Sequence, residues 1–309
     1  MAISLALVKQ IASMFIIMFF GFLTIRLKAL TMENSKVISK LTIYVVAPCC
    51  LISSFQIDYS PDKLTGLLLS LGCALFIHIL YIGLTKSVEK PFKLTGLERA
   101  SVIYPNSVNL IIPLIVAVLG KEWVFYSSGF MIVQNIIVWT HGKSVVCGER
   151  QRDFKSIITN VNIIAIFVGL ILFLTRLQLP VIVKNSFEAV GDMLGPLSML
   201  VIGMLLGNMR LKEIMGNKRA YFIVFLRLVA LPLIATVILG LSHISGLHPE
   251  GKNILLITVM SASSAAAATV TQFAQLYDKT PAYAGVINVM SVLLCIITMP
   301  LMVALFQLF

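Results

Sequence analysis

Ten long apolar windows follow one another along the chain, and they limit what it can fold into more than any other feature. They fall near residues 5–26, 37–57, 64–85, 98–119, 122–141, 157–175, 185–208, 219–241, 253–275 and 283–307. A spanning helix needs about 20 apolar residues. Only 12% of the 309 residues are charged, against about 25% in soluble domains. The sequence therefore predicts an all-α polytopic membrane protein with ten transmembrane helices, and it argues against most soluble enzymes and nucleic-acid-binding proteins.

The distribution of basic residues orients these spans. Seventeen of the 24 Lys and Arg residues lie in odd-numbered connections and five in even-numbered ones. Since cytoplasmic connections carry the excess of basic residues, we expect a multi-pass protein of the cell inner membrane with both termini outside. The same rule accounts for the net charge of +11, so we expect the lipid bilayer as a partner and no nucleic acid. The five cysteines have no paired spacing, and we predict no metal and no cofactor.

The longest connection, around residues 142–156, divides the chain into two sets of five spans. We expect a first five-helix repeat over residues 1–141, a cytoplasmic connecting loop over 142–156 and a second five-helix repeat over 157–309. Because five is odd, the second set enters the membrane in the opposite sense, and inverted repeats of this kind are typical of secondary transporters. Polar amides occur in the last span of each set, at Gln134 and Asn135 and at Asn288.

The fourth span is interrupted by two prolines with polar residues between them. Pro105 and Pro113 each remove a backbone donor and clash with the carbonyl four residues earlier. The polar residues between them are Asn106, Ser107 and Asn109. Backbone that leaves the helix at membrane depth is tolerated only where it is buried in protein or lines a water-filled cavity. A kinked helix with its Asn residues bonded to neighbouring helices is the alternative, but two prolines around three polar residues favour a binding site.

The ninth span has no proline but contains a run of small residues with hydroxyl groups. Ser261, Ser263, Ser264, Thr269 and Thr271 surround four consecutive alanines. Small residues permit close helix packing, and a crossing of spans four and nine would need thin helices. The two readings are compatible, and in the second the hydroxyl groups face the crossing point.

Three ionisable residues within spans are candidates for ion coupling or gating. They are His78 in span three, Asp192 in span seven and Arg227 in span eight. For His78 a neutral, hydrogen-bonded core imidazole is favoured over a proton relay. Asp192 and Arg227 could pair with each other, or Asp192 could bind a cation or proton while Arg227 holds an anion.

The sequence resembles the auxin efflux carrier superfamily, in its bacterial malate/malonate permease-like branch. The resemblance runs nearly end to end and rests on the order and spacing of several short motifs. They are Gly21-Phe-Leu-Thr-Ile-Arg26, Val46-Ala47-Pro48 before Leu51-Ile-Ser-Ser-Phe55, Tyr104-Pro105-Asn106-Ser107-Val108, Asn106 with Pro113 seven residues later, Leu194-Gly195-Pro196-Leu197-Ser198, Ile202-Gly203-Met204-Leu205-Leu206, Arg227-Leu-Val-Ala-Leu-Pro232 and Thr298-Met299-Pro300-Leu301. The chain departs from the family pattern at Val108 and Ile111, where glycines are usual, and near Ala262, where a proline is usual.

This resemblance implies two inverted five-helix repeats with a crossover of broken helices four and nine near the midplane. That fold is similar to bile-acid/sodium symporters and sodium/proton antiporters. It also implies transport of small carboxylates such as malate or malonate. These departures from the family pattern, together with Tyr104 and Val108 in place of the plant motif's flanking Asn and Tyr, leave the break in span nine and the substrate open.

The leading hypothesis is a secondary transporter that carries a small organic anion by alternating access at the helix 4/9 crossover, one five-helix half rocking against the other. The expected substrate-binding residues are Pro105, Asn106, Ser107, Asn109, Gln134, Asn135, Ser263, Ser264 and Asn288. Proton or sodium coupling, transport without coupling, and a homodimer all stay open. The alternatives are a transporter-fold sensor or receptor and a carrier of a lipophilic substrate. A channel is a further class, but no ring-forming charged segment is visible. No catalytic residue is predicted, because the motifs of membrane enzymes are missing.

Overall fold

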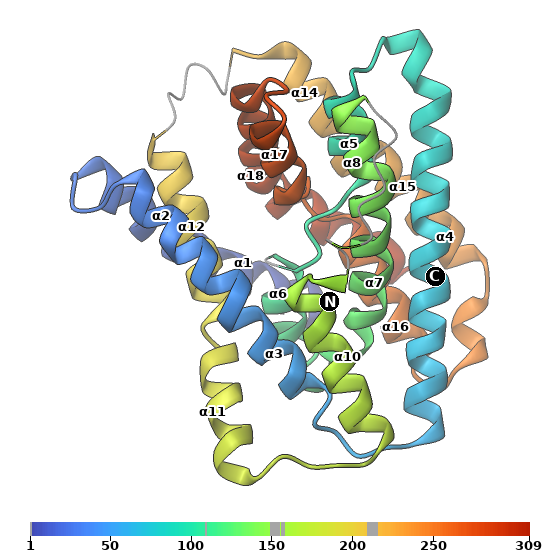
Figure 1. Ribbon diagram of the computed structural model, residues 1–309. Coiled ribbons are helices and arrows are strands. Elements are labelled where there is room, and N and C mark those ends of the chain that lie inside the picture. The colour runs from blue at the N-terminus through green and yellow to red at the C-terminus, as the bar shows by residue number, and fades with distance from the viewer. Residues whose placement is uncertain (1, 109, 149–154, 156–157, 209–215) are drawn as a thin grey trace. The chain divides into compact units, whose positions relative to one another are not determined.

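The computed structural model describes residues 2–108, 110–148, 155, 158–208 and 216–309 (Figure 1). Each of the ten predicted windows contains helix. Among the described residues the one extended contact is an isolated antiparallel bridge between Pro105 and Ala266. The predicted all-α class is therefore confirmed.

Five helical stretches among the described residues are long and apolar enough to cross a membrane. They are Met32–Ser54, Pro61–Phe92, Val181–Asn208, Lys218–Leu241 and Pro281–Phe306. Shorter apolar helices cover Ala12–Arg26, Val161–Leu174 and Gly251–Ala262. Large apolar side chains such as Ile79, Phe167 and Ile171 stay exposed on these helices. A lipid environment suits such surfaces, and the chain is a multi-pass membrane protein.

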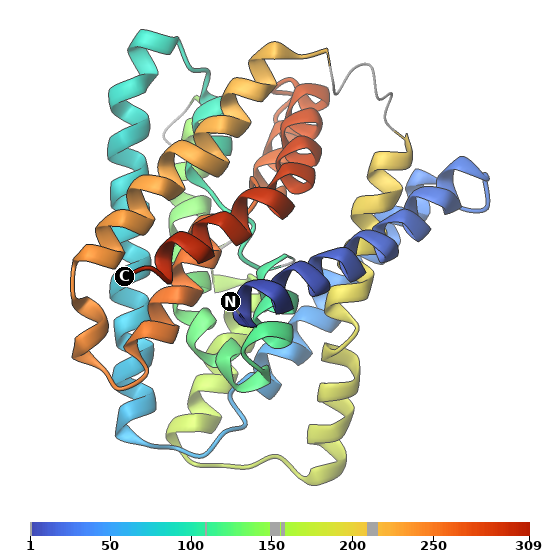
Figure 2. The ribbon, with the colours of Figure 1, turned by 180° about the vertical axis from the view of Figure 1, so that it is seen from behind.

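The chain divides into two compact units. Unit 1 comprises residues 1–64, 108–128 and 158–210. Its elements are α1 (Ala2–Arg26), α2 (Met32–Leu41), η1 (Thr42–Val46), α3 (Ala47–Ser54), α6 (Ile111–Val118), η2 (Lys121–Trp123), α10 (Val161–Leu174), α11 (Val181–Gly191) and α12 (Leu194–Asn208). Figure 2 shows α1 in blue against α12 in yellow.

Glycines let α1 and α12 pack with their backbones in contact. A Cβ atom built on Gly203 would lie 1.9 Å from the carbonyl oxygen of Met18. One built on Gly21 would lie 2.2 Å from the carbonyl oxygen of Leu200. Because neither helix could carry a side chain at these points, the pair depends on small residues, as is typical of membrane helix interfaces.

Unit 2 comprises residues 65–107, 129–157 and 211–309. Its elements are most of α4 (Pro61–Phe92) and of α7 (Val124–Ile137), with α5 (Gly96–Ile103), η3 (Val138–Gly142), α8 (Lys143–Cys147), α14 (Lys218–Phe225), η4 (Leu226–Ala230), α15 (Leu231–Leu241), η5 (Ile244–Leu247), α16 (Gly251–Ala262), α17 (Ala268–Leu276) and α18 (Pro281–Phe306). Each unit takes segments from both halves of the chain. The compact units thus have other boundaries than the predicted repeats 1–141 and 157–309. The two repeats remain a prediction.

The predicted connecting loop over 142–156 begins too early. Helix continues from η3 into α8 and ends at Cys147, because Gly148 takes the left-handed conformation that closes a helix (φ +79°). Val146 is buried, and α8 packs against α5 and α17. Residues 149–154 and 156–157 of this predicted loop lie outside the described residues.

Two prolines follow π-helical turns. Pro48 comes just after η1 and Pro232 just after η4. A proline ring clashes with the carbonyl group four residues earlier, which here belongs to Tyr44 and Leu228, both inside the wider turns. The wider turn makes room for the ring without ending the span, and η4 also contains Arg227.

Candidate functional site

The fourth and ninth spans are both broken, and the two breaks pair with each other inside unit 2. Helix α5 ends at Ile103 and α16 ends at Ala262. The amide of Asn106 donates to the carbonyl oxygen of Ala265 at 2.8 Å, and the amide of Ala267 donates to that of Tyr104 at 2.9 Å. The predicted crossing of spans four and nine is therefore present, including the break in span nine that the missing proline had left open.

Side chains from distant segments satisfy the carbonyl groups that the second break releases. Buried backbone groups need partners, and here the donors come from α4, η4, α18 and the facing break. Ala262 accepts from Arg227 Nη2 at 2.7 Å and from the Tyr81 hydroxyl at 3.1 Å, Ser263 from Cys295 Sγ at 3.5 Å, Ser264 from Arg227 Nε at 2.9 Å, Ala265 from the Asn106 amide at 2.8 Å and Ala266 from Asn288 Nδ2 at 2.9 Å. The break is thus a built part of the fold.

Two predicted site residues, Gln134 and Asn288, hold the bridge by their amide nitrogens. Gln134 Nε2 donates to the carbonyl oxygen of Pro105. Asn288 Nδ2 donates to the carbonyl oxygen of Ala266 at 2.9 Å. One N–H of each side-chain amide is thus engaged with backbone, and the Oε1 atom of Gln134 has no partner among the described residues.

Several buried polar side-chain atoms near the two breaks have no hydrogen-bond partner among the described residues. They are the hydroxyl oxygens of Ser107, Ser261, Ser263 and Ser264 and the Oε1 atom of Gln134. The Asn106 side chain, 8% exposed, also makes no hydrogen bond within the described residues. Unpaired polar atoms of this kind call for an explanation, of which an absent ligand or water is one.

The remaining predicted substrate-binding residues differ in their surroundings. Asn135 is half-buried, and its Nδ2 donates to the Met131 carbonyl oxygen of its own helix at 2.9 Å. Pro105 contributes its backbone to the bridge. Asn109 lies outside the described residues. Pro113 does not break the span again, because it lies in the first turn of α6, where a missing amide hydrogen removes no helical bond.

The candidates for ion coupling or gating lie in three different settings. Within the described residues all hydrogen bonds of Arg227 go to backbone carbonyl groups, whereas Asp192 forms its ion pair with Lys121. Each of these two residues therefore has partners of its own within its unit. His78 is fully buried, with Nδ1 2.7 Å from the carbonyl oxygen of Ala74 and its ring 5.1 Å from that of Phe130. This geometry requires the proton on Nδ1 and fits the favoured reading of a core imidazole.

Unit 1 contains a cavity of about 350 Å³ between α3, α6, α11 and α12. Its charged lining residues are Lys121, Glu122, Lys184, Glu188 and Asp192. Lys121 Nζ lies 2.7 Å from Asp192 Oδ1, and the two side chains are 54% and 58% exposed. The hydrogen bond to the Asp192 carboxylate raises the pKa of Lys121 above its ordinary value. Asp192 therefore lies beside a charged cavity, paired with a lysine.

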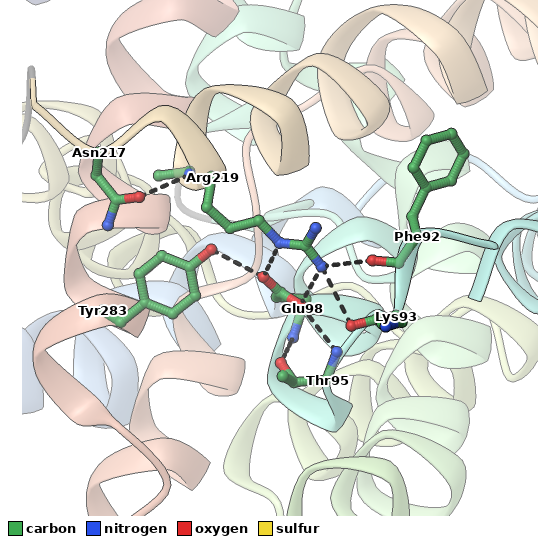
Figure 3. Close-up of polar contacts among 8 residues, drawn as sticks. Phe92, Lys93, Thr95, Glu98, Asn217, Arg219 and Tyr283 are labelled. Carbon is green, nitrogen blue, oxygen red and sulfur yellow. Dashed lines mark hydrogen bonds and ion pairs between the residues drawn. The ribbon is translucent and has the colours of Figure 1, made fainter. Parts of the chain in front are cut away.

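A buried carboxylate at the start of α5 was missed by the sequence analysis. Glu98, with a side chain 3% exposed, accepts from Arg219 Nε at 2.7 Å and from the Tyr283 hydroxyl at 3.0 Å (Figure 3). Its other oxygen accepts from the Thr95 amide at 2.8 Å and from Arg219 Nη2 at 3.0 Å. The spacing Thr95-x-x-Glu98 is a capping box and could have indicated this position. The cluster joins α5, α14 and α18 at one end of unit 2.

Comparison with known families gives the class of the protein. The model of a family described as membrane transport protein matches residues 6–153 and 151–303. No curated protein matches the chain at a significant level. The match covers nearly the whole chain and agrees with the motifs that resemble the auxin efflux carriers. The chain therefore belongs to the membrane transport protein family, the family of the auxin efflux carriers.

Proposed function

We propose that the protein is a secondary carrier of small carboxylates and that the carboxylate binds at the crossover of spans four and nine. The observation that carries this proposal is the group of buried, unpaired hydroxyl groups on Ser107, Ser263 and Ser264, with the side-chain amide of Asn106 next to Ser107 in the sequence. A carboxylate oxygen accepts hydrogen bonds from hydroxyl and amide groups. Helix α17 begins at Ala268, directly after the second break, and its N-terminus adds partial positive charge.

Neutral donors suit a carrier better than a fixed cation would. A buried ion pair with the substrate would hold the anion strongly and slow its release, whereas hydroxyl groups exchange easily with water. Gln134 Oε1, which has no partner among the described residues, can only accept a hydrogen bond. Such an acceptor matches a ligand hydroxyl group, which favours a hydroxy acid such as malate over malonate.

Alternating access would use the compact units as its moving bodies. Residues 104–107 and 263–267, which form the crossover, all belong to unit 2. We therefore propose that unit 2 carries the substrate as a body, in place of the sequence half that the repeat boundaries suggest. Proton or sodium coupling is not required by this arrangement.

Uptake into proteoliposomes tests the proposal. The purified protein is reconstituted, and uptake of labelled malate, malonate, lactate and acetate is measured with an imposed sodium, proton or electrical gradient. We expect saturable uptake, with malate preferred over malonate. Lack of saturable uptake of any acid by folded protein, together with uptake of lipophilic or cationic compounds, would exclude the carboxylate proposal.

A further inference from the structure

The two helices that end at the crossover direct their carbonyl ends into a buried space. Helix α5 ends at Ile103 and α16 at Ala262. The C-terminus of a helix carries partial negative charge, and its last carbonyl groups lack partners within the helix. In carriers with discontinuous helices, ends of this kind coordinate the coupling cation. A buried place with these properties needs positive charge.

Arg227 supplies that charge from the π-helical turn η4. Its side chain is fully buried. On α16 and the break after it, Nη2 donates to Ala262 at 2.7 Å and Nε to Ser264 at 2.9 Å. On α5, Nη1 donates to Val102 at 3.1 Å and to Ile103 at 3.3 Å. One guanidinium group thus joins the carbonyl ends of both half-helices.

The surroundings of Arg227 differ from those of an ordinary buried arginine. Isolated buried charges are costly, and they are normally paired with opposite charges. Among the described residues no carboxylate bonds to Arg227, and its neighbour is the Tyr81 ring, whose centroid lies 5.5 Å from Cζ. Carbonyl dipoles and an aromatic face take the place of a counter-ion. These are the ligands that a bound monovalent cation would have.

We propose that Arg227 is a built-in cation of the crossover, which occupies the place of a bound metal cation among the half-helix carbonyl groups. The guanidinium satisfies the oxygens that would otherwise bind sodium, so the crossover keeps its shape without an inorganic ion. The proposal depends on the proposed function only for the statement that the crossover carries the substrate. Arg227 acts as a positioning residue, since its bonds go to backbone and leave the substrate to the neutral groups.

Chemical rescue tests the proposal without any transport assay. Thermal unfolding of the purified protein in detergent is followed for the wild type, for Arg227→Ala and for Leu228→Ala, a buried neighbour in the same turn. Both variants are expected to melt at least about 5 °C below the wild type. Low-millimolar guanidinium chloride, compared with choline chloride at equal ionic strength, should raise the melting temperature of Arg227→Ala in a saturable manner. It should leave the wild type and Leu228→Ala unchanged.

Two results would overturn the proposal. One is an Arg227→Ala protein that melts with the wild type, and the other is a response to guanidinium no larger than that of Leu228→Ala. If Arg227→Ala does not fold, Arg227→Gln, which fills more of the space, is measured in the same way. Arg227→Lys keeps a cation but loses the planar fork. It should melt between the wild type and Arg227→Ala and respond less to guanidinium than Arg227→Ala.

A transport arm separates this proposal from the proposed function. In proteoliposomes, carboxylate uptake by Arg227→Ala should fall at least tenfold and recover in part when guanidinium is present on both sides. If wild-type protein takes up no carboxylate, the proposed function fails while the melting comparison still decides the role of Arg227. If uptake is found but guanidinium does not raise the melting temperature of Arg227→Ala, the role of Arg227 as a built-in cation is excluded and the carrier proposal stands.

Discussion

Gln134 and Asn288 make the same contact on the two sides of one bridge. Gln134 Nε2 donates to the carbonyl group of Pro105, and Asn288 Nδ2 donates to that of Ala266 at 2.9 Å. Pro105 and Ala266 are themselves the paired residues of the antiparallel bridge. One amide lies on α7 in the first half of the chain and the other on α18 in the second half. This correspondence is what an inverted repeat would produce.

Replacing either amide should weaken the crossover by a similar amount. Gln134→Met and Asn288→Leu each leave one buried carbonyl oxygen without a donor, and we expect a cost of about 1–3 kcal/mol for each. Because both side chains hold one bridge, the double variant should lose less stability than the sum of the two single variants. Chemical unfolding in detergent measures these values.

The control for these variants is Thr298→Val. The Thr298 hydroxyl donates to the Leu294 carbonyl oxygen within α18, far along the helix from the bridge, so its removal should change stability little. Additive losses from Gln134→Met and Asn288→Leu would contradict a shared role.

The contact between α1 and α12 should not tolerate a methyl group at Gly203. The added Cβ would lie 1.9 Å from the carbonyl oxygen of Met18, so Gly203→Ala has to push the two backbones apart. We expect loss of folded protein in size-exclusion chromatography. Gly83→Ala on α4 is the matched change, because nothing lies within 4 Å of its Cβ. It should be neutral or slightly stabilising, and equal yields of both variants would refute this packing.

Loss of Arg219 should destabilise unit 2, because it leaves the Glu98 carboxylate buried with fewer donors. The carboxylate keeps the Thr95 amide and the Tyr283 hydroxyl but loses both guanidinium bonds. We expect Arg219→Ala to cost about 3 kcal/mol. Lys218→Ala, one residue earlier and exposed, should cost almost nothing in the same unfolding experiment. If both variants lost similarly little stability, burial of the Glu98 carboxylate would not depend on its bonds to Arg219.

The Lys121–Asp192 pair should contribute little to stability. Both side chains are more than half exposed, at 54% and 58%, and exposed pairs contribute about 0–1 kcal/mol. The pKa of Lys121 is raised in the folded protein. The contribution of the pair to the free energy of unfolding is therefore complete below the ordinary lysine pKa and is lost only as the pH rises through the raised pKa. We expect this contribution to be constant from about pH 6 to about pH 9. A double-mutant cycle with Lys121→Gln and Asp192→Asn measures the coupling free energy of the pair. A coupling well above about 1 kcal/mol would contradict the small contribution expected of an exposed pair.

The sequence predicted the break in span four for a local reason, whereas the break in span nine was implied only by the family resemblance and was left open. Pro105 removes a donor where α5 stops, so the break is visible in one residue type. Residues 265–268 are four alanines, the strongest helix formers. Three of them, residues 265–267, leave the helix because Tyr104, Asn106, Asn288 and Ser291 bond to their backbone groups. Such long-range partners cannot be found from local sequence.

The polar candidates were chosen by residue type, and type does not decide what a side chain contacts. Asn106 and Asn135 looked equivalent in sequence, yet Asn135 donates to its own helix while Asn106 makes no side-chain hydrogen bond among the described residues. Arg227 was weighed as an anion clamp, but its observed bonds all go to carbonyl groups. Only the spatial arrangement separates groups that are free for a ligand from groups that hold the fold.

This difference between two asparagines gives the most direct test of the central claim that the crossover binds the substrate. Carboxylate uptake into proteoliposomes is compared for the wild type, Asn106→Ala and Asn135→Ala, with equal amounts of folded protein confirmed by size-exclusion chromatography. We predict that Asn106→Ala abolishes saturable uptake, while Asn135→Ala keeps more than about half of it, since its amide nitrogen already donates to a carbonyl group of α7. Retained uptake by folded Asn106→Ala, with or without a loss in Asn135→Ala, would contradict the crossover site.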